Sequence, residues 1–394
     1  MTARPVALAL VESPAQLLNF LEWALGERDG APEPVRCEAA VLLPLDPATR
    51  HQLRVMADVA RAEGIDVGLY DIRKVPVGFA HALASLVRKL TTADRLVIGD
   101  PFSGIIQRLL PLARTRDFVL VDDGTATLEL SSQLLAGHPL VRWHHSGSMP
   151  GAAARAARRI SPGGGTRLEV FSCLTSAGLR LPPGAVASFN GYGWARQRYG
   201  LPQVRPGTDM IGTSLAETGL IDPDRYVHEV VMLAHQLNAE RYFAHRREDP
   251  DKLRLLAEYG ELEIVRPELP LELELLTGPV ADTLVCLLST VLYTLPLVLA
   301  GSGVEITACA DVAGWLAGAG HLRAGGRLPG RGNRSMTWNA TLKLTAKSAF
   351  ESCTGLRVTR ARAAHPRAET PGRAEAPGKV AASARPPARR PTGC

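Results

Sequence analysis

Short apolar runs alternate with amphipathic stretches along the first third of the chain. The apolar runs predicted as strands are Val6–Val11, Ala39–Leu45, Val67–Ile72, Arg95–Ile98 and Phe118–Val121. After the first run, Ser13-Pro14 is typical of a helix start, because serine caps the first turn and proline fits inside it. Strands that are apolar throughout are buried on both faces, so five such β–α units predict a doubly wound parallel sheet.

The alternation stops and then resumes. Residues 146–166 are rich in Pro, Gly, Ser and small basic residues, which is typical of a linker. Beyond them, a second set of strands and helices is expected. Its predicted strands are Leu168–Leu174, Arg241–Ala244, Glu263–Val265, Val285–Leu288 and Val304–Thr307. We therefore expect a Rossmann-like domain over 1–145, a linker over 146–166 and a second Rossmann-like domain over 167–320.

Residues 321–394 differ from the rest in charge. They carry 15 Lys/Arg and 3 Asp/Glu, a net charge of +12, whereas residues 1–320 carry a net charge of −6. A basic nucleic-acid groove through the folded part is disfavoured by this distribution. The segment has few large apolar residues, which predicts a disordered basic tail. A natural tail and the translation of a shifted reading frame both fit this composition.

The cysteines and the absent motifs narrow the chemistry. The six cysteines are scattered without a CxxC pair or zinc-ligand spacing, so they are expected to be reduced, in a cytoplasmic protein. No metal site is predicted. The sequence has no GxxxxGK[ST], GxGxxG or GxSxG, which argues against P-loop, dinucleotide-binding and serine-hydrolase sites. The apolar stretch Thr283–Ala300 contains Ser289, Thr290 and Pro296, and is expected to be a buried strand and helix rather than a membrane span.

Candidate site residues follow the strands, since ligands bind at the carboxyl edge of parallel sheets. Asp122-Asp123-Gly124 ends a strongly apolar strand, and a half-buried carboxylate there is suited to general-base chemistry. Gly124 allows the sharp turn that exposes the aspartates. The alternative is an ordinary capping turn into the following helix.

His245-Arg246-Arg247 follows the predicted strand Arg241–Ala244. A phosphate needs hydrogen bonds and positive charge, and an imidazole beside two guanidinium groups supplies both. The alternative is a solvated charged loop, in which the histidine caps nearby backbone.

Three further positions carry weaker signals. Ser289-Thr290 precedes a helix and is suited either to anion binding or to simple capping. Gly212-Thr213 lies in a strand-to-loop passage that could line a nucleotide or form a plain turn. Glu272 could accept hydrogen bonds from ribose hydroxyls, or could complement a helix dipole.

The order of these features resembles the bacterial sialyltransferases and polysialyltransferases of glycosyltransferase family 52, over about residues 5–310. Asp122-Asp123-Gly124 is similar to that family's D/E-D/E-G motif, and Ser289-Thr290 to its Ser-Ser/Thr motif. The other similar positions are His245, with Arg246 in place of the family's proline, Glu12-Ser13-Pro14 and Gly212–Leu215.

The resemblance implies a GT-B fold, with two Rossmann-like, doubly wound parallel-sheet domains facing a cleft. It also implies an inverting transferase that moves sialic acid, or a related nonulosonate, from a CMP-sugar to a glycan hydroxyl. By resemblance, Asp122, or Asp123, is the general base, and His245 assists departure of the phosphate. The implied nucleotide-sugar-binding residues are Gly212, Thr213, Arg246, Arg247, Glu272, Ser289 and Thr290, and the implied acceptor-side residues are Ser13, Gly124 and Thr125.

No metal or other cofactor is expected for this reaction, because cationic side chains and helix dipoles would take the place of a metal. The expected partners are the nucleotide sugar and a glycan acceptor. The expected location is the cytoplasm, with peripheral contact to anionic membrane through the basic tail. Two alternatives remain: a GT-B transferase for another nucleotide sugar, and a non-catalytic protein of polysaccharide assembly.

Overall fold

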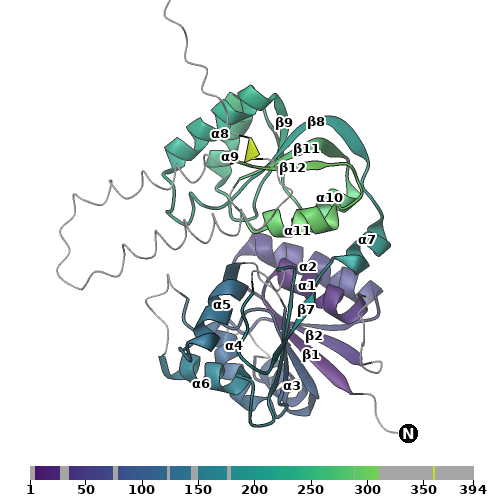
Figure 1. Ribbon diagram of the computed structural model, residues 1–394, viewed down its shortest axis with the longest axis vertical. Helices are drawn as coiled ribbons and strands as arrows, with labels where there is room; N and C mark the ends of the chain where they lie inside the picture. The colour runs from purple at the N-terminus through teal and green to yellow at the C-terminus, as the bar shows by residue number, and fades with distance from the viewer. Residues whose placement is uncertain are drawn as a thin grey trace, which may run out of the picture. The chain divides into compact units, whose positions relative to one another are not determined.

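The computed structural model describes residues 5–26, 35–73, 79–121, 125–142, 150–174, 179–287, 289–309 and 358–359. These residues form two sheets, and neighbouring strands in both sheets are parallel. Both sheets belong to one compact unit of the chain. The α/β class with two parallel, doubly wound sheets is confirmed (Figure 1).

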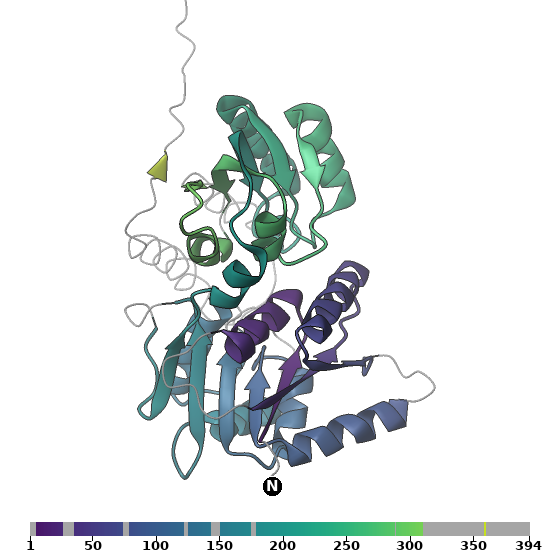
Figure 2. The ribbon, with the colours of Figure 1, turned by 90° about the vertical axis from the view of Figure 1, so that its right-hand side faces the viewer.

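The first sheet has the strand order β3-β2-β1-β4-β5-β6-β7. Its strands are β1 (Val6–Val11), β2 (Arg36–Leu42), β3 (Asp66–Tyr70), β4 (Arg95–Ile98), β5 (Asp117–Val121), β6 (Arg167–Ser172) and β7 (Ala185–Phe189). Figure 2 shows these strands side by side. The strand β1 lies inside the sheet between β2 and β4, which explains its unbroken apolar sequence.

Helices cover both faces of the first sheet. They are α1 (Pro14–Leu25), α2 (Pro47–Ala62), α3 (Phe79–Thr92), α4 (Gly104–Leu109), the 3-10 turn η1 (Leu110–Leu112), α5 (Thr125–Leu135) and α6 (Pro150–Ile160). Successive strand residues point to opposite faces. Ala7 and Ala9 therefore join the apolar cluster that includes α1 and α2, whereas Leu8 joins the cluster that includes α3, α4 and α6.

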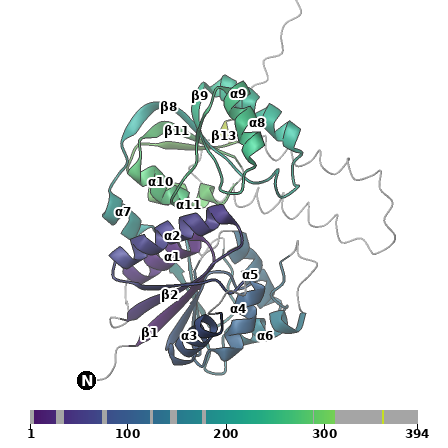
Figure 3. The ribbon, with the colours of Figure 1, turned by 180° about the vertical axis from the view of Figure 1, so that it is seen from behind.

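The second sheet has the strand order β10-β9-β8-β11-β12-β13. Its strands are β8 (Val204–Ile211), β9 (Ala239–Phe243), β10 (Glu263–Val265), β11 (Val280–Cys286), β12 (Glu305–Cys309) and the two-residue β13 (Val358–Thr359). Its helices are α8 (Pro223–Leu237), α9 (Pro250–Gly260), α10 (Leu271–Thr277) and α11 (Val291–Val298). Met210 packs with α8 and α9 and Ile211 with α10 and α11, so this sheet too is covered on both faces (Figure 3).

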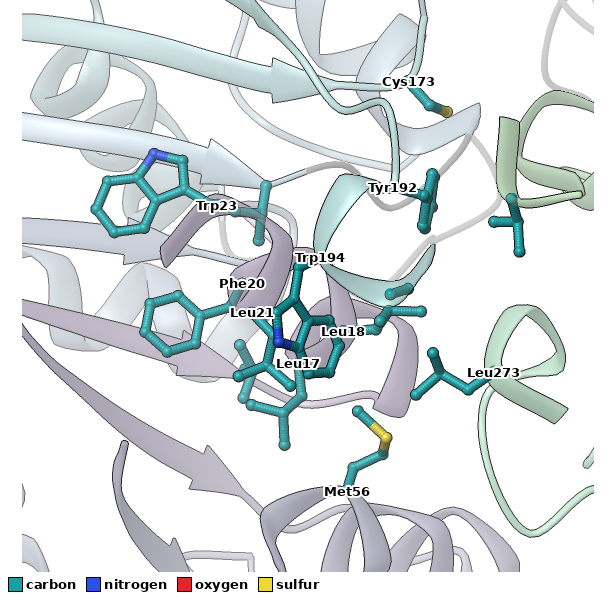
Figure 4. Packing of buried hydrophobic residues seen from close by; sticks show 14 of the residues in the cluster. Leu17, Leu18, Phe20, Leu21, Trp23, Met56, Cys173, Tyr192, Trp194 and Leu273 are labelled. Atoms are coloured by element: carbon teal, nitrogen blue, oxygen red, sulfur yellow. The ribbon is translucent and has the colours of Figure 1, made fainter. Parts of the chain in front are cut away.

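The segment between the two sheets contains the short helix α7 (Gly193–Tyr199). The buried carboxylate of Glu22, on α1, accepts hydrogen bonds from the backbone N–H groups of Trp194 (3.0 Å) and Ala195 (2.9 Å). Burial raises the pKa of Glu22 to about 7. Figure 4 shows Trp194 packed beside apolar side chains of α1, in the cluster that also contains Met56 of α2. One side chain of α1 thus holds the start of α7.

The predicted domain boundary was wrong. Strands β6 and β7 pair with β5 and with each other, so residues 167–189 complete the first sheet rather than begin the second. The expected linker 146–166 contains α6, which packs on the first sheet through Ala156 and Ile160. The passage to the second sheet lies between Phe189 and Val204. Pairing between distant strands, which local sequence does not encode, decides this boundary.

The predicted disordered tail, 321–394, lies outside the described residues apart from Val358–Thr359, which pair with β12. Within the described ranges, no helix is both long enough and apolar enough to cross a membrane.

Candidate functional site

A pocket lies at the carboxyl edge of the second sheet and has a volume of about 140 Å³. Residues that follow β8, β9 and β11 line it, as expected for a ligand site in a parallel α/β fold. Its lining residues from the second half are Ile211, Gly212, Phe243, Ala244, His245, Arg246, Pro267, Leu269, Pro270, Leu271, Glu272, Ser289, Thr290 and Val291. Pro14, Ala15 and Gln52 of the first half complete the lining.

The structure brings six of the sequence-predicted residues to this pocket. These residues are Gly212, His245, Arg246, Glu272, Ser289 and Thr290. Thr213 is buried directly after the pocket glycine, and its backbone N–H donates to Tyr226 Oη at 3.3 Å. Arg247 is exposed and is not part of the lining. Of the two predicted arginines, Arg246 is therefore the one placed to contact a ligand in this pocket.

The tautomer of His245 follows from its backbone surroundings. The backbone N–H of Arg247 donates to Nδ1 of His245 at 3.3 Å, so Nδ1 acts as an acceptor and the ring proton lies on Nε2. Burial, with the positive charges of Arg246, Arg247 and Lys252, lowers the pKa of His245 to about 3. The imidazole is therefore neutral near pH 7 and presents an Nε2–H donor.

Gly212 is required at its position by close packing. A Cβ atom at this residue would lie 2.4 Å from the hydroxyl oxygen of Tyr242. The Gly212 N–H donates to the carbonyl oxygen of Phe243 at 2.9 Å, which ties the end of β8 to the end of β9. Packing against Tyr242 therefore requires a glycine here, and the nucleotide-binding role of Gly212 stays a prediction.

The start of α11 faces the same pocket. Thr290 is the N-cap residue of α11, yet its side chain makes no capping hydrogen bond to the described helix. The first N–H groups of a helix have no partner within the helix itself and carry the positive end of its dipole. In α11, however, the N–H groups of Leu292 and Tyr293 already donate to the carbonyl oxygens of Ser289 (3.4 Å) and Thr290 (3.0 Å). The donors that this helix start offers to an anion are therefore mainly the two hydroxyls, aided by the helix dipole.

Glu272 lies in the first turn of α10 and is buried. Its Oε1 accepts a hydrogen bond from the Thr294 hydroxyl at 2.7 Å, which joins α10 to α11. Part of its role is therefore structural, and the carboxylate also reaches the pocket lining.

The carboxyl edge of the first sheet has a different character. Glu12, after β1, forms an ion pair with Arg73, and Asp100, after β4, forms one with Arg142 at 2.9 Å. Burial raises the pKa of Glu12, although hydrogen bonds from Ser103 and Arg73 and the charge of Arg73 oppose the rise. The polar groups at this edge are largely paired with one another.

The expected acceptor-side residues fall at this first edge. Ser13 is the N-cap of α1, and its Oγ accepts from the backbone N–H of Gln16 at 3.2 Å. Thr125 begins α5, and nothing is described of its side chain. The catalytic candidates Asp122 and Asp123, with Gly124, lie outside the described residues, so their role stays a prediction.

Sequence reasoning missed the residues behind the histidine loop. Glu248 lies beneath His245, and Tyr226 and Tyr242 contact it from α8 and β9. Gln52 was missed as well; its Nε2 donates to the carbonyl oxygen of Pro267 at 2.6 Å, beside the pocket. The sequence signal that could have indicated Glu248 was its position three residues after His245.

Groups of three or more His, Cys, Asp or Glu residues arranged to hold a metal ion do not occur among the described residues.

No family model matches the chain, and no curated protein matches it. The family 52 resemblance therefore stays unconfirmed. Solved structures to which the chain is similar include the heptosyltransferase WaaC of E. coli with ADP-2-deoxy-2-fluoro heptose. That match has 15% identity and a TM-score of 0.38, and covers 77% of this chain and 88% of that chain. MurG of Acinetobacter baumannii matches with 13% identity and a TM-score of 0.33, covering 88% of this chain and 91% of that chain. A function is therefore inferred from this chain's own pocket.

Proposed function

We propose that the chain is an inverting glycosyltransferase that moves sialic acid, or a related nonulosonate, from a CMP-sugar to a glycan hydroxyl. The observation that carries the proposal is the convergence of His245, Arg246 and the start of α11 on one pocket. An imidazole N–H, a guanidinium group and a helix N-terminus are all groups that bind phosphate. The order of motifs along the chain supports CMP-sialic acid as the donor.

The pocket lining suggests how the nucleotide is held. Gly212 lines the pocket at the end of β8, so a phosphate can lie beside its backbone, and packing against Tyr242 explains why this position carries no side chain. The apolar residues Pro267, Leu269 and Leu271 provide a surface for the ribose and base. The carboxylate of Glu272 accepts hydrogen bonds from ribose hydroxyls. Thr213 supports the glycine turn from behind.

The leaving phosphate gains negative charge as the glycosidic bond breaks. In the mechanism that we propose, the Nε2–H of His245, the guanidinium of Arg246 and the hydroxyls of Ser289 and Thr290 stabilise that charge. His245 acts as a hydrogen-bond donor rather than as an acid, since its pKa of about 3 leaves it neutral before substrate binds. The bound phosphate then raises that pKa, because it is an opposite charge beside the ring.

The acceptor hydroxyl needs a proton acceptor on the opposite side of the sugar. We assign that role to Asp122, with Asp123 as the substitute, following the family motif. Since the cationic groups of the pocket stabilise the leaving phosphate, we expect transfer to continue in EDTA. A strict requirement for a divalent cation would contradict this part of the proposal.

The first test is nucleotide binding measured by isothermal titration calorimetry with CMP, UDP, GDP and ADP. We expect CMP to bind most tightly, and Arg246→Ala to weaken CMP binding about tenfold, since it removes a charge-assisted hydrogen bond. Arg247→Ala is the matched control, because this neighbouring arginine is exposed and outside the lining, and its effect should be less than about threefold. Tighter binding of another nucleotide would favour a transferase for a different nucleotide sugar.

The second test is transfer itself. CMP-sialic acid is incubated with a panel of galactosides and sialosides, and products are identified by mass spectrometry. We expect a sialylated product from the intact protein and none from the Asp122→Asn/Asp123→Asn double variant. Undiminished transfer by the double variant would overturn the base assignment. Failure to release CMP from any CMP-sugar would favour a non-catalytic assembly protein.

We also propose a cytoplasmic location with peripheral contact to anionic membrane through residues 321–394, because their net charge is +12. Flotation with vesicles that contain anionic lipid, at low and high salt, tests this. Binding that is absent at low salt would refute it.

A further inference from the structure

The carboxylate of Glu248 is buried directly beneath the histidine loop. Its side chain has no solvent exposure. One oxygen, Oε2, accepts a hydrogen bond from the backbone N–H of His245 at 3.0 Å. The other, Oε1, accepts from the Tyr242 hydroxyl at 2.7 Å and from Lys252 Nζ at 3.1 Å. Both oxygens are thus occupied by donors that come from different elements of the fold.

Two buried tyrosines extend this contact to the glycine turn. The hydroxyls of Tyr226 and Tyr242 lie 2.6 Å apart, and each has only one proton to donate. The two short contacts each need one proton, so Tyr242 donates to Glu248 at 2.7 Å and Tyr226 donates to Tyr242. The contact of the Tyr226 hydroxyl with Glu248 Oε1 is longer, at 3.4 Å, and the same hydroxyl accepts from the Thr213 N–H at 3.3 Å. The chain of hydrogen bonds therefore runs in one direction, from the turn at Gly212-Thr213 to the carboxylate. Burial, with the charge of Glu248 nearby, raises the pKa of both tyrosines well above 10, so both keep their protons.

The cation that faces Glu248 lies in the same cluster and is shared with a second carboxylate. Lys252, whose side chain is 4% exposed, contacts Glu248 and also forms an ion pair with Glu217 at 2.8 Å. Glu217 in turn accepts from the backbone N–H of Asp249, the N-cap of α9, at 2.9 Å. Burial raises the pKa of Glu248, whereas the charge of Lys252 and the hydrogen bonds from Tyr242 and Lys252 oppose the rise. The donors that face its two oxygens show that the carboxylate acts as an acceptor on both sides.

We infer that Glu248 is a positioning residue of the phosphate site. It fixes the backbone of His245 directly and the Gly212-Thr213 turn through the two tyrosines, so both walls of the phosphate site depend on one carboxylate. Because the backbone N–H of Arg247 sets the tautomer of the ring, an altered loop would also alter which nitrogen carries the proton. The inference goes beyond the proposed function, and it rests on that function only for the statement that the positioned groups bind phosphate.

A carboxylate is required because both of its oxygens act as acceptors. The glutamine that replaces it in Glu248→Gln is nearly the same size but has one acceptor and one donor. Its NH2 group would face either the His245 N–H or the Lys252 ammonium group, and both of these can only donate. The substitution therefore disrupts one wall of the site without creating a cavity.

The experiment compares the full-length protein with Glu248→Gln, and has two readouts. The first is NMR of the His245 ring without ligand, which reports its tautomer and pKa. We expect an Nε2–H ring with a pKa of about 3 in the unaltered protein. In the variant, we expect a mixed tautomer and a pKa that moves towards the usual 6.5. The second readout is CMP affinity, which we expect to fall about tenfold.

Val230→Ala is the matched control. Val230 is buried in the apolar cluster that contains Tyr226 and Tyr242, but it belongs to α8 and takes no part in the hydrogen-bond chain. It should lower the unfolding midpoint while leaving the His245 signals and CMP affinity unchanged. Glu248→Asp is the second variant if Glu248→Gln does not fold. Its shorter carboxylate cannot reach both walls, so the same changes should appear in smaller measure.

The outcomes separate the two proposals. Unchanged His245 tautomer and pKa in a folded Glu248 variant would overturn the positioning role. Altered His245 signals in the variant, together with no CMP binding by the unaltered protein, would support the positioning role and contradict the proposed function. Equal changes in Val230→Ala would show that general destabilisation causes them, and would also overturn the inference.

Discussion

The carboxyl edges of the two sheets carry similar residue types but use them differently. At the first edge, the described charged groups neutralise one another, as in the pairs Glu12–Arg73 and Asp100–Arg142. At the second edge, His245 and Arg246 face a pocket, and the ion pair of Glu248 with Lys252 lies beneath them. Paired charges stabilise a fold, whereas polar side chains that line a pocket can contact a ligand. The comparison predicts that substitutions at the first edge affect mainly stability, and that those at the second edge affect mainly binding and transfer.

The largest effect is expected at the second edge. His245→Ala removes a hydrogen-bond donor to the leaving phosphate, which typically lowers turnover by about 10²–10³-fold. The measurement is the initial rate of product formation with CMP-sialic acid. The control is His235→Ala, because His235 is an exposed histidine of α8 that does not line the pocket. Its Nε2 lies 2.8 Å from the carbonyl oxygen of Tyr259. Equal rates for the two variants would show that His245 takes no part in transfer.

The next effect belongs to the first edge. Arg73→Met leaves the carboxylate of Glu12, whose side chain is 10% exposed, without its ionic partner. Breaking a buried pair in this way costs about 3 kcal/mol of unfolding free energy, measured by urea denaturation. CMP affinity should stay within about twofold, and Glu12→Gln/Arg73→Met should recover part of the lost stability. A loss of CMP affinity as large as the loss of stability would contradict the prediction that substitutions at the first edge affect mainly stability.

A smaller effect is expected from crowding at the pocket glycine. In Gly212→Ala, the new Cβ would lie 2.4 Å from the Tyr242 hydroxyl oxygen, so the loop must shift. We expect a loss of about 2 kcal/mol in stability and weaker CMP binding. Gly104→Ala is the control, because no atom lies within 4 Å of its added Cβ. If Gly212→Ala bound CMP normally, close approach of the backbone would not be part of the site.

The smallest effects distinguish the edges by pH. The folded-state pKa of His245 is lowered to about 3, so this residue makes stability rise as the pH increases from 3 to 6.5. The folded-state pKa of Glu12 is raised, so this residue makes stability fall as the pH rises above about 4.5. Urea denaturation of His245→Asn and Glu12→Gln across pH 4–8 should give difference curves of opposite slope. Across this pH range, each difference in the free energy of unfolding should be on the order of 1 kcal/mol, because both groups retain some solvent contact. Parallel curves would contradict this assignment.

The local elements could be predicted from the sequence. Apolar runs marked β1, β4 and β5, and the pair Ser13-Pro14 marked the start of α1. These signals work because capping and burial depend on neighbours in sequence. The six pocket residues were found by the same logic, since the ends of parallel strands meet at one edge.

Long-range features could not be predicted in this way. The membership of β6 and β7 in the first sheet depends on pairing with β5, and nothing in their own sequence states it. Glu248 occurs in a charged run that is typical of a solvated loop, yet it is buried against Tyr226 of α8 and Tyr242 of β9. Asp209 is similar: it lies in β8 with no exposure and is neutralised by Arg205 and Arg241. Partners that come from other strands and helices decide whether a charged residue is buried.

The seven-stranded order of the first sheet has a consequence for dividing the protein into fragments. A cut near residue 145 would strip β6 and β7 from β5, leaving the edge of an apolar strand bare and open to association with other chains. A cut between Phe189 and Gly193 would keep every described strand with its neighbours, but it would separate α7 from Glu22. A soluble amino-terminal fragment should therefore extend through residue 200, so that the Glu22 carboxylate retains both backbone donors.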